Sequence, residues 1–464
     1  MSTATADSAP VDVSKRDDRY PAQIPFIIGN EACERFSYYG MRSILTVFMV
    51  QTLAMAASDS KAIYHLFVSA CYLTPLLGAY ISDRQWGKYK TILLLSLGYC
   101  VGHGILATGE SRTILYAGLF FIAMGAGGIK PCVSAYVGDQ FTSKNKHLVK
   151  NVFDLFYWSI NFGSFFSTML IPWVYAKYGS RLAFGIPGIL MALALFIFWL
   201  GRDKYHNVPP TRETGSAGFL PVVLSAWKRR SARKAGEGFF KPALADYTAQ
   251  DVDGAEAAAA IFRVFAAVSI FWALFDQHGS SWVLQAKQME LNVWGWQLEA
   301  SQLSALNPLM VMGLIPIFSY GIYPAIEKLG FPMTPLRRMS AGMVVAATSF
   351  AAAALIQIPL DHGTKISAAW QVIPYLLLTA AEIMVSITGL EFAYTQAPRS
   401  MKSTIMSFWF LTVFAGNLIT AYVSEINIFE GAAFFWFFAA LMASVSVIFI
   451  WEAGRYQVRD YYEK

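Results

Sequence analysis

The sequence predicts an all-α membrane protein that crosses the bilayer twelve times, with the helices arranged in two bundles of six. Only 14% of the 464 residues are charged and 56% are hydrophobic, whereas about 25% of residues are charged in an ordinary soluble domain. Apolar runs of about 20 residues, long enough to span a hydrocarbon core, recur between short polar turns. The mean hydropathy is positive. This composition excludes soluble enzymes and nucleic-acid-binding proteins.

The first half begins after a polar tail. Residues 1–23 contain no apolar stretch of the kind found in a signal peptide, so we expect a cytoplasmic tail. The first six-helix bundle is assigned to residues 24–201. Its predicted membrane spans are 24–54, 60–82, 89–108, 113–138, 149–176 and 181–201.

A polar stretch, 202–256, separates the two halves and is predicted to be a cytoplasmic linker. Within it, 219–227 has the pattern of a short amphipathic helix and precedes a basic run, 228–234. We expect this part to lie on the inner membrane surface. Two interpretations of its role stay open: a solvated charged connection between the halves, or a regulatory or lipid-specific role.

The second bundle is assigned to residues 257–455, and 456–464 form a second cytoplasmic tail. Its predicted spans are 259–284, 300–327, 336–358, 368–396, 402–426 and 431–453.

The basic residues orient the chain. Most of the 36 lysines and arginines fall in the tails and in alternate loops, which places those loops and both termini in the cytoplasm. Three are left deep within the membrane after this assignment: Arg35, Arg42 and Lys130. An ionisable residue at this depth costs about 2.5 to 3.5 kcal/mol on insertion scales, so such residues are functional candidates.

The first span carries a polar stripe. Six residues lie within an arc of roughly 140° on one helix face: Glu31, Glu34, Arg35, Tyr38, Tyr39 and Arg42. Glu31 and Arg35 are four residues apart and can form an ion pair. A purely structural ion-pair network is the alternative interpretation.

Other spans contribute single polar or aromatic side chains to the predicted site. These are His65, Tyr72, Tyr157, Asn161, Trp272, Asp276, Asn307, Glu382, Ser407 and Trp409. His65 is either a hydrogen-bonded core residue or a proton carrier. Glu382 is expected to contact a ligand, and Glu391 is interpreted as a member of an ion pair near the cytoplasmic end.

The charges indicate the class of ligand. Three cations in the first half and a deep carboxylate in the second suit a zwitterion, such as an amino acid or a short peptide. The asparagine amides could bond its polar groups, and the aromatic residues would tolerate varied side chains. Buried acids and a histidine could link protonation to binding.

Several motifs resemble the proton-dependent oligopeptide transporter family of the major facilitator superfamily. Residues 31–39 match its ExxERFxYY motif, and 153–164 resemble its FYxxINxGS signature, from which Phe162 departs. Residues 78–84, with Gly87 and Lys88, resemble the superfamily's loop between helices two and three. The stretches around 63–67, 271–277 and 389–394 are similar to the animal peptide transporters.

The resemblance implies a major facilitator fold that imports di- and tripeptides with protons by alternating access. It assigns proton coupling to Glu31, Glu34, Arg35, His65 and Asp276. It assigns the peptide carboxylate to Arg35, Arg42 and Lys130, and the amino end to Glu382, Asn161 and Asn307. The pocket would contain Tyr38, Tyr39, Tyr72, Tyr157, Trp272, Ser407 and Trp409, and the loop residues Asp83 and Arg84 would take part in gating.

We therefore expect a multi-pass protein of the cell membrane that works as a monomer, touches membrane lipid, binds no nucleic acid, and uses no metal or cofactor besides the coupling proton. Two alternatives remain: a symporter for nitrate or another small solute, and a peptide-sensing receptor without transport. An enzyme is not expected, since the chain contains no HExxH, GxSxG or P-loop motif.

Overall fold

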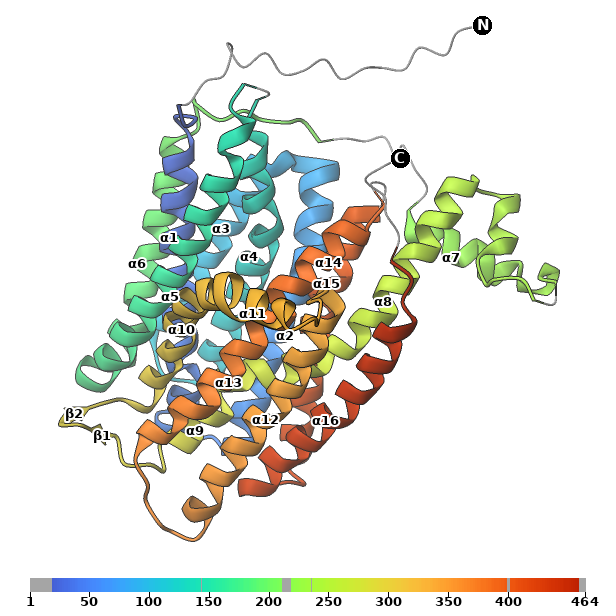
Figure 1. Ribbon diagram of the computed structural model, residues 1–464. Coiled ribbons are helices and arrows are strands. Elements are labelled where there is room, and N and C mark those ends of the chain that lie inside the picture. Colours follow the sequence, from blue (N-terminus) through green and yellow to red (C-terminus); the bar gives the residue numbers. More distant parts are fainter. Residues whose placement is uncertain (1–18, 143, 211–217, 235, 399–400, 459–464) are drawn as a thin grey trace, which may run out of the picture.

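The computed structural model describes residues 19–142, 144–210, 218–234, 236–398 and 401–458 (Figure 1). Most of the two predicted tails lies outside these ranges. The first half consists of α1 (Ile24–Gln51), α2 (Ala57–Ile81), α3 (Gly87–Thr108), α4 (Arg112–Asp139), α5 (Val149–Tyr178) and α6 (Ser180–Leu200). A π-helical turn, η2 (Ser82–Trp86), joins α2 to α3, and a 3-10 turn, η3 (Lys146–Leu148), precedes α5.

The second half contains more interruptions. Its α-helices are α7 (Phe219–Lys228), α8 (Ala249–Phe275), α9 (Ser281–Ala286), α10 (Leu306–Pro316), α11 (Tyr323–Lys328), α12 (Pro335–Asp361), α13 (Val372–Glu382), α14 (Thr388–Gln396), α15 (Lys402–Ile426) and α16 (Gly431–Arg455). Two strands, β1 (Asn292–Val293) and β2 (Trp296–Gln297), form a small antiparallel hairpin in which Asn292 pairs with Gln297. The 3-10 segments η6 (Asp276–Gly279) and η7 (Ala300–Ala305) flank α9 and the hairpin.

Two of the predicted spans each consist of two helices. The π-helical turn η8 (Ile317–Ile322) joins α10 to α11, and η10 (Ile383–Ile387) joins α13 to α14. Pro316 ends α10, and because proline has no backbone N–H it weakens the regular ladder at that point. With each pair taken as one segment, twelve long helical segments lie within the described ranges, so the prediction of a twelve-helix, all-α chain is confirmed.

The first long helix of the second half extends beyond its predicted membrane span. Helix α8 begins at Ala249 instead of residue 259, so the end of the predicted linker is helical. The hydroxyl of Thr248 caps this helix by accepting a hydrogen bond from the Asp251 amide at 3.2 Å. The alanines that follow have the highest helix propensity of any residue, and they continue the helix to the membrane span. The predicted amphipathic helix at 219–227 is confirmed as α7.

Helices α1 and α5 differ from the other long helices because neither contains a membrane-length stretch that is sufficiently apolar. Within the described ranges, nine helical stretches are long and apolar enough to cross a membrane, and one of them, 57–108, covers both α2 and α3. Helices α1 and α5 are absent from this set although both have membrane length. Several of their polar residues are buried in the protein, among them Glu31 and Glu34 of α1 and Ser159 and Asn161 of α5.

Each half has its own apolar core. One cluster of buried side chains lies among α1 to α6 and the other lies almost wholly among α7 to α16. The halves meet where α2 packs on α15 and where α1 and α5 contact the η6–η7 segment. Close packing within the first half depends on glycine: a Cβ on Gly78 of α2 would lie 2.1 Å from the carbonyl oxygen of Gly128 in α4.

Candidate functional site

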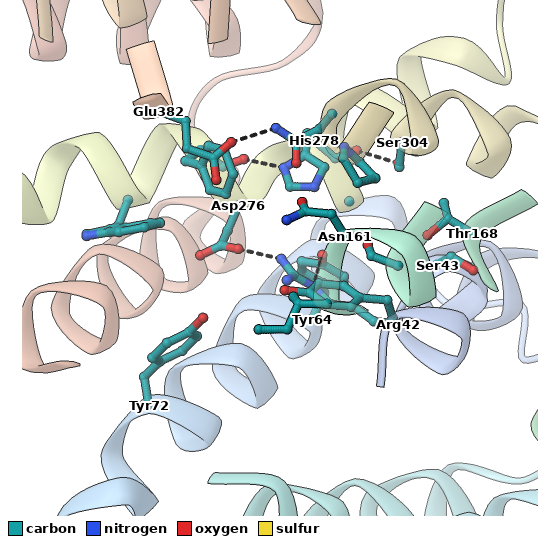
Figure 2. A pocket seen from close by; sticks show the side chains of 18 of the residues that line it. Arg42, Ser43, Tyr64, Tyr72, Asn161, Thr168, Asp276, His278, Ser304 and Glu382 are labelled. Carbon is teal, nitrogen blue, oxygen red and sulfur yellow. Dashed lines mark hydrogen bonds and ion pairs between the residues drawn. The ribbon is translucent and has the colours of Figure 1, made fainter. Parts of the chain in front are cut away.

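A cavity of about 170 Å³ lies between the two halves (Figure 2). Helices α1, α2 and α5 line it from the first half, and α8, η6, η7, α10 and α13 line it from the second. Nine of the residues predicted for the site are among its lining: Tyr39, Arg42, Tyr72, Tyr157, Asn161, Trp272, Asp276, Asn307 and Glu382. The fold therefore brings together side chains that lie more than 300 residues apart in the sequence.

An ion pair between Arg42 and Asp276 crosses the boundary between the halves (Figure 2). Both side chains are buried, and the Arg42 Nε also donates a hydrogen bond to the hydroxyl of Tyr64. The second carboxylate oxygen of Asp276 accepts a hydrogen bond from the Asn417 amide nitrogen at 2.7 Å. Each charged group thus has a charged partner and at least one further hydrogen bond, as a buried ion pair requires.

His65 lies behind this pair and is fully buried. Its Nδ1 is 2.8 Å from the Asn417 amide oxygen, and its Nε2 is 2.7 Å from the Ser280 hydroxyl. Because Asn417 turns its amide nitrogen to Asp276, its oxygen must accept, so Nδ1 of His65 carries a hydrogen. His65 is therefore connected to Asp276 through one amide group and does not itself line the cavity.

Glu382 belongs to the second half and lies across the cavity from Arg42 in Figure 2. Its carboxylate accepts a hydrogen bond from the Asn307 amide nitrogen at 2.8 Å. That nitrogen is also 3.2 Å from the hydroxyl of Thr379. Asn161 lines the cavity from α5, where its amide nitrogen donates to the Tyr157 carbonyl at 3.0 Å.

The other predicted cations lie behind the cavity lining. The Arg35 Nε is 2.6 Å from Glu31 and 3.1 Å from Glu34, which confirms the ion pair expected between residues 31 and 35. The Lys130 Nζ lies 4.5 Å and 4.4 Å from the ring centres of Tyr38 and Tyr72. Such distances allow cation–π attraction. Since Tyr72 lines the cavity, Lys130 is one side chain away from it.

The remaining predicted residues lie farther from the cavity. Tyr38 is buried with its ring edge-on to Tyr39, and Trp409 packs edge-on against Trp272, so each lies one layer behind a lining residue. Ser407 is half-buried outside the lining. Asp83 and Arg84 are exposed in η2.

Glu391 lies 3.7 Å from Arg338, which confirms its interpretation as a member of an ion pair. Among the described residues, no group of three histidine, cysteine or acidic side chains is arranged to hold a metal ion.

Several polar residues of this region were not predicted for the site, among them Tyr64, His278, Ser304 and Asn417. Tyr64, His278 and Ser304 line the cavity, and Asn417 connects His65 to Asp276. The sequence does mark Asn417 as a candidate, because a polar amide in the middle of an apolar run is unusual. His278 and Ser304 lie in the irregular η6–η7 segment, where helical periodicity cannot predict which way a side chain points.

Further contacts close the cavity at the end where α1 finishes. The Thr46 hydroxyl donates to the Gly279 carbonyl at 3.1 Å, and the Gln302 amide nitrogen donates to the Met169 carbonyl at 2.7 Å. Both bonds join the first half to the η6–η7 segment of the second. Together with the pair of Arg42 and Asp276, they hold the halves against each other at this end.

Comparison with known proteins identifies the family. The sequence model of the POT family, PTR2, matches residues 89–436. Solute carrier family 15 member 2 of Homo sapiens is 37% identical over 394 residues, which cover 80% of this chain and 54% of that protein. Peptide transporter 3 of Caenorhabditis elegans is 37% identical over 362 residues, which cover 74% of this chain and 52% of that protein. The chain thus spans about half the length of these curated relatives.

Solved structures match over nearly the whole chain. The crystal structure of an auto-inhibited POT family peptide transporter is 40% identical, with a TM-score of 0.88 over 95% of this chain and 98% of that one. The POT family transporter PepTSo is 40% identical, with a TM-score of 0.89 over 96% of this chain and 100% of that one. The chain therefore belongs to the POT family, and its twelve membrane helices in two bundles of six form a major facilitator fold.

Proposed function

We propose that this chain is a proton-coupled symporter that imports di- and tripeptides by alternating access. One observation carries the proposal: a single cavity between the halves contains a cation, Arg42, from the first half and a carboxylate, Glu382, from the second. A zwitterion that bridges these groups would contact both halves at once, so its binding can be linked to their relative motion. Relatives that are named peptide transporters support a peptide as that zwitterion.

The peptide's amino end would lie at Glu382, where Asn307 and Asn161 add amide groups. Its carboxylate would face Arg42, with Lys130 and Arg35 available if the side chains behind the lining rearrange. Tyr39, Tyr157 and Trp272 offer large surfaces that combine apolar and polar atoms. Such surfaces accept varied side chains because they impose few directional contacts.

Protons would act through the ion pairs. Asp276 holds Arg42, and Glu31 and Glu34 hold Arg35, so a peptide carboxylate competes with these acids for the same cations. Protonation of Asp276, or of His65 beside it, would weaken the hold on Arg42, and protonation of Glu31 or Glu34 would free Arg35. Each proton that moves inward gains about 2.3 kcal/mol per 100 mV of membrane potential, roughly a 50-fold accumulation.

The proposal also covers the orientation of the chain in the membrane, its oligomeric state and its need for cofactors. The distribution of basic residues supports a cell-membrane protein with both termini in the cytoplasm. The contacts that hold the halves together then lie at the outer end, which corresponds to a state closed to the outside. We propose that the protein works as a monomer, is not an enzyme, and uses no cofactor besides the coupling proton.

The test is uptake by proteoliposomes under an imposed inward pH gradient and an inside-negative potential. A labelled dipeptide should accumulate above its external concentration, and unlabelled di- and tripeptides should compete, whereas free amino acids, tetrapeptides and nitrate should not. Accumulation of nitrate in place of the peptide would favour the other symporter alternative. Saturable peptide binding without accumulation would favour a sensing receptor.

A further inference from the structure

Helix α7 has two different faces. Val222 and Ala226 are buried and belong to the apolar cluster that includes Val252 and Ala255 of α8. On the opposite face, Leu220, Leu224 and Trp227 are 67%, 47% and 54% exposed. These three residues recur at the spacing of one helix face. The described protein thus leaves an apolar stripe of α7 uncovered.

The chain that follows this stripe is strongly basic. Residues 219–246 contain six lysines and arginines and two acidic residues. Arg229 forms an ion pair with Asp246 at 2.6 Å, and its hydrogen bond lowers the pKa of that carboxyl to about 2. Arg230 lies over the Trp227 ring, with its guanidinium carbon 4.7 Å from the ring centre. Positive charge therefore borders the exposed apolar stripe.

We propose that α7 and the basic run 228–234 bind the surface of an anionic lipid bilayer. An apolar helix face rimmed by lysine and arginine is the arrangement that lies in the membrane interface, where the stripe enters the acyl boundary and the cations meet phosphate groups. Figure 1 shows α7 projecting sideways from the bundle, at the end where α8 begins. The presence of Trp227 on this helix agrees with a position at the membrane interface, where tryptophan is enriched.

A solvated connection between the halves, the other interpretation of this segment, accounts for the charge and leaves the stripe unexplained. A connection surrounded by water gains nothing from three large apolar side chains on one helix face. Charge decides between lipid and an apolar protein partner, because an excess of lysine and arginine favours an anionic surface.

The lipid-bound segment would be attached to the second half of the molecule. Phe219 packs edge-on against Phe408 of α15, with ring centres 5.1 Å apart, and Phe408 lies 4.6 Å from Phe262 of α8. The Ser225 hydroxyl donates to Asp246 at 2.5 Å and ties α7 to the chain that leads into α8. Lipid contact at α7 would therefore hold this part of the second half at the bilayer surface.

The test places a nitroxide label at Leu224→Cys and, as a matched control, at Ser231→Cys, an exposed residue beyond the stripe. Both are made in a chain whose four native cysteines are replaced. In vesicles of phosphatidylglycerol and phosphatidylcholine, we expect the label at 224 to collide more often with oxygen than with a water-soluble nickel chelate. The label at 231 should show the opposite preference. Greater access of the nickel chelate to the label at 224 would overturn the proposal.

A second variant tests the charge. We combine Arg230→Gln, Arg233→Gln and Lys234→Gln with the label at 224. The ratio of collisions with the nickel chelate to collisions with oxygen should then rise several-fold, because the helix loses its attraction to the anionic surface. The control pair Lys328→Gln and Arg337→Gln, exposed in another loop, should leave this ratio unchanged. Equal effects of both sets would contradict specific lipid contact at this run. Neither measurement requires transport, so both are independent of the proposed function.

Discussion

Arg42 of α1 and Asp276 of η6 form an ion pair across the two halves of the molecule, and both side chains also line the central cavity. The same ion pair therefore holds the two halves together and lines the cavity. A ligand carboxylate that takes Arg42 leaves Asp276 without its cation. A proton that neutralises Asp276 leaves Arg42 without its anion and free to bind a ligand carboxylate. Ligand binding and protonation are therefore linked at this one pair.

Breaking this pair should open the closed end. We expect Asp276→Asn to raise the reactivity of Thr46→Cys toward a membrane-impermeant thiol reagent by at least about tenfold. Thr46 is fully buried against Gly279, and removing one partner of a buried ion pair costs about 3 to 5 kcal/mol, where 1.4 kcal/mol is tenfold. The labelling rate on intact cells measures this.

The control for this measurement is Asp139→Asn. Asp139 pairs with Lys88 at 2.6 Å within the first half, so its loss should leave the labelling of Thr46→Cys unchanged. Slow labelling in Asp276→Asn would show that the pair does not hold the halves together.

Glu382→Gln should lower the apparent affinity for peptides with a free amino end by about ten- to a hundredfold. The carboxylate lines the cavity, and a hydrogen bond to a charged group contributes about 1.5 to 3 kcal/mol. Concentration-dependent uptake measures this change, and Glu382→Ala should abolish uptake. Glu391→Gln is the matched control, because Glu391 is paired with Arg338 outside the cavity. Full transport by Glu382→Ala would remove Glu382 from the site.

His65→Gln should abolish proton-driven accumulation and retain part of the peptide exchange. Glutamine can replace the hydrogen bonds to Asn417 and Ser280 but cannot carry a proton between them. The control is His103→Gln, since His103 is equally buried but bonded only within the first half, to Ser37 at 2.9 Å. Accumulation and counterflow in the same proteoliposomes separate the two effects.

Glu34→Gln should uncouple transport in the same way as His65→Gln, because Glu34 shares Arg35 with Glu31. Its neutral form would mimic the protonated acid permanently. If neither Glu34→Gln nor His65→Gln changed proton-driven accumulation, both residues would lose their proposed coupling role.

Gly78→Ala should destabilise the first half. The added Cβ would meet the backbone of Gly128 at 2.1 Å, where no flexible side chain can move aside. Overpacking of this kind costs about 1 to 3 kcal/mol or more. Thermal unfolding of the detergent-solubilised protein should show a lower Tm. Gly98→Ala is the control, since nothing lies within 4 Å of its Cβ position, and an equal Tm for both variants would contradict the close packing of α2 on α4.

The sequence was most informative where a residue conflicted with its surroundings. Arg42, Asp276 and Glu382 stand out in apolar runs because charge is expensive in a membrane, and all three line the cavity. Tyr38 was placed in the pocket because it shares the polar face of its helix, and Trp409 because of its residue type, and the structure places each one layer behind the lining. Aromatic rings pack as readily behind a cavity as along it, so residue type cannot distinguish the two.

The sequence by itself determined the number of membrane helices, the ion pair of Glu31 with Arg35, and the family. These follow from helix length, from spacing within one helix, and from local motifs, which depend on residues close together in the chain. Only the tertiary structure decided that Arg42 meets Asp276 and that Asn417 connects His65 to that pair. Those partners are hundreds of residues apart, and their contact depends on how two separately packed bundles face each other.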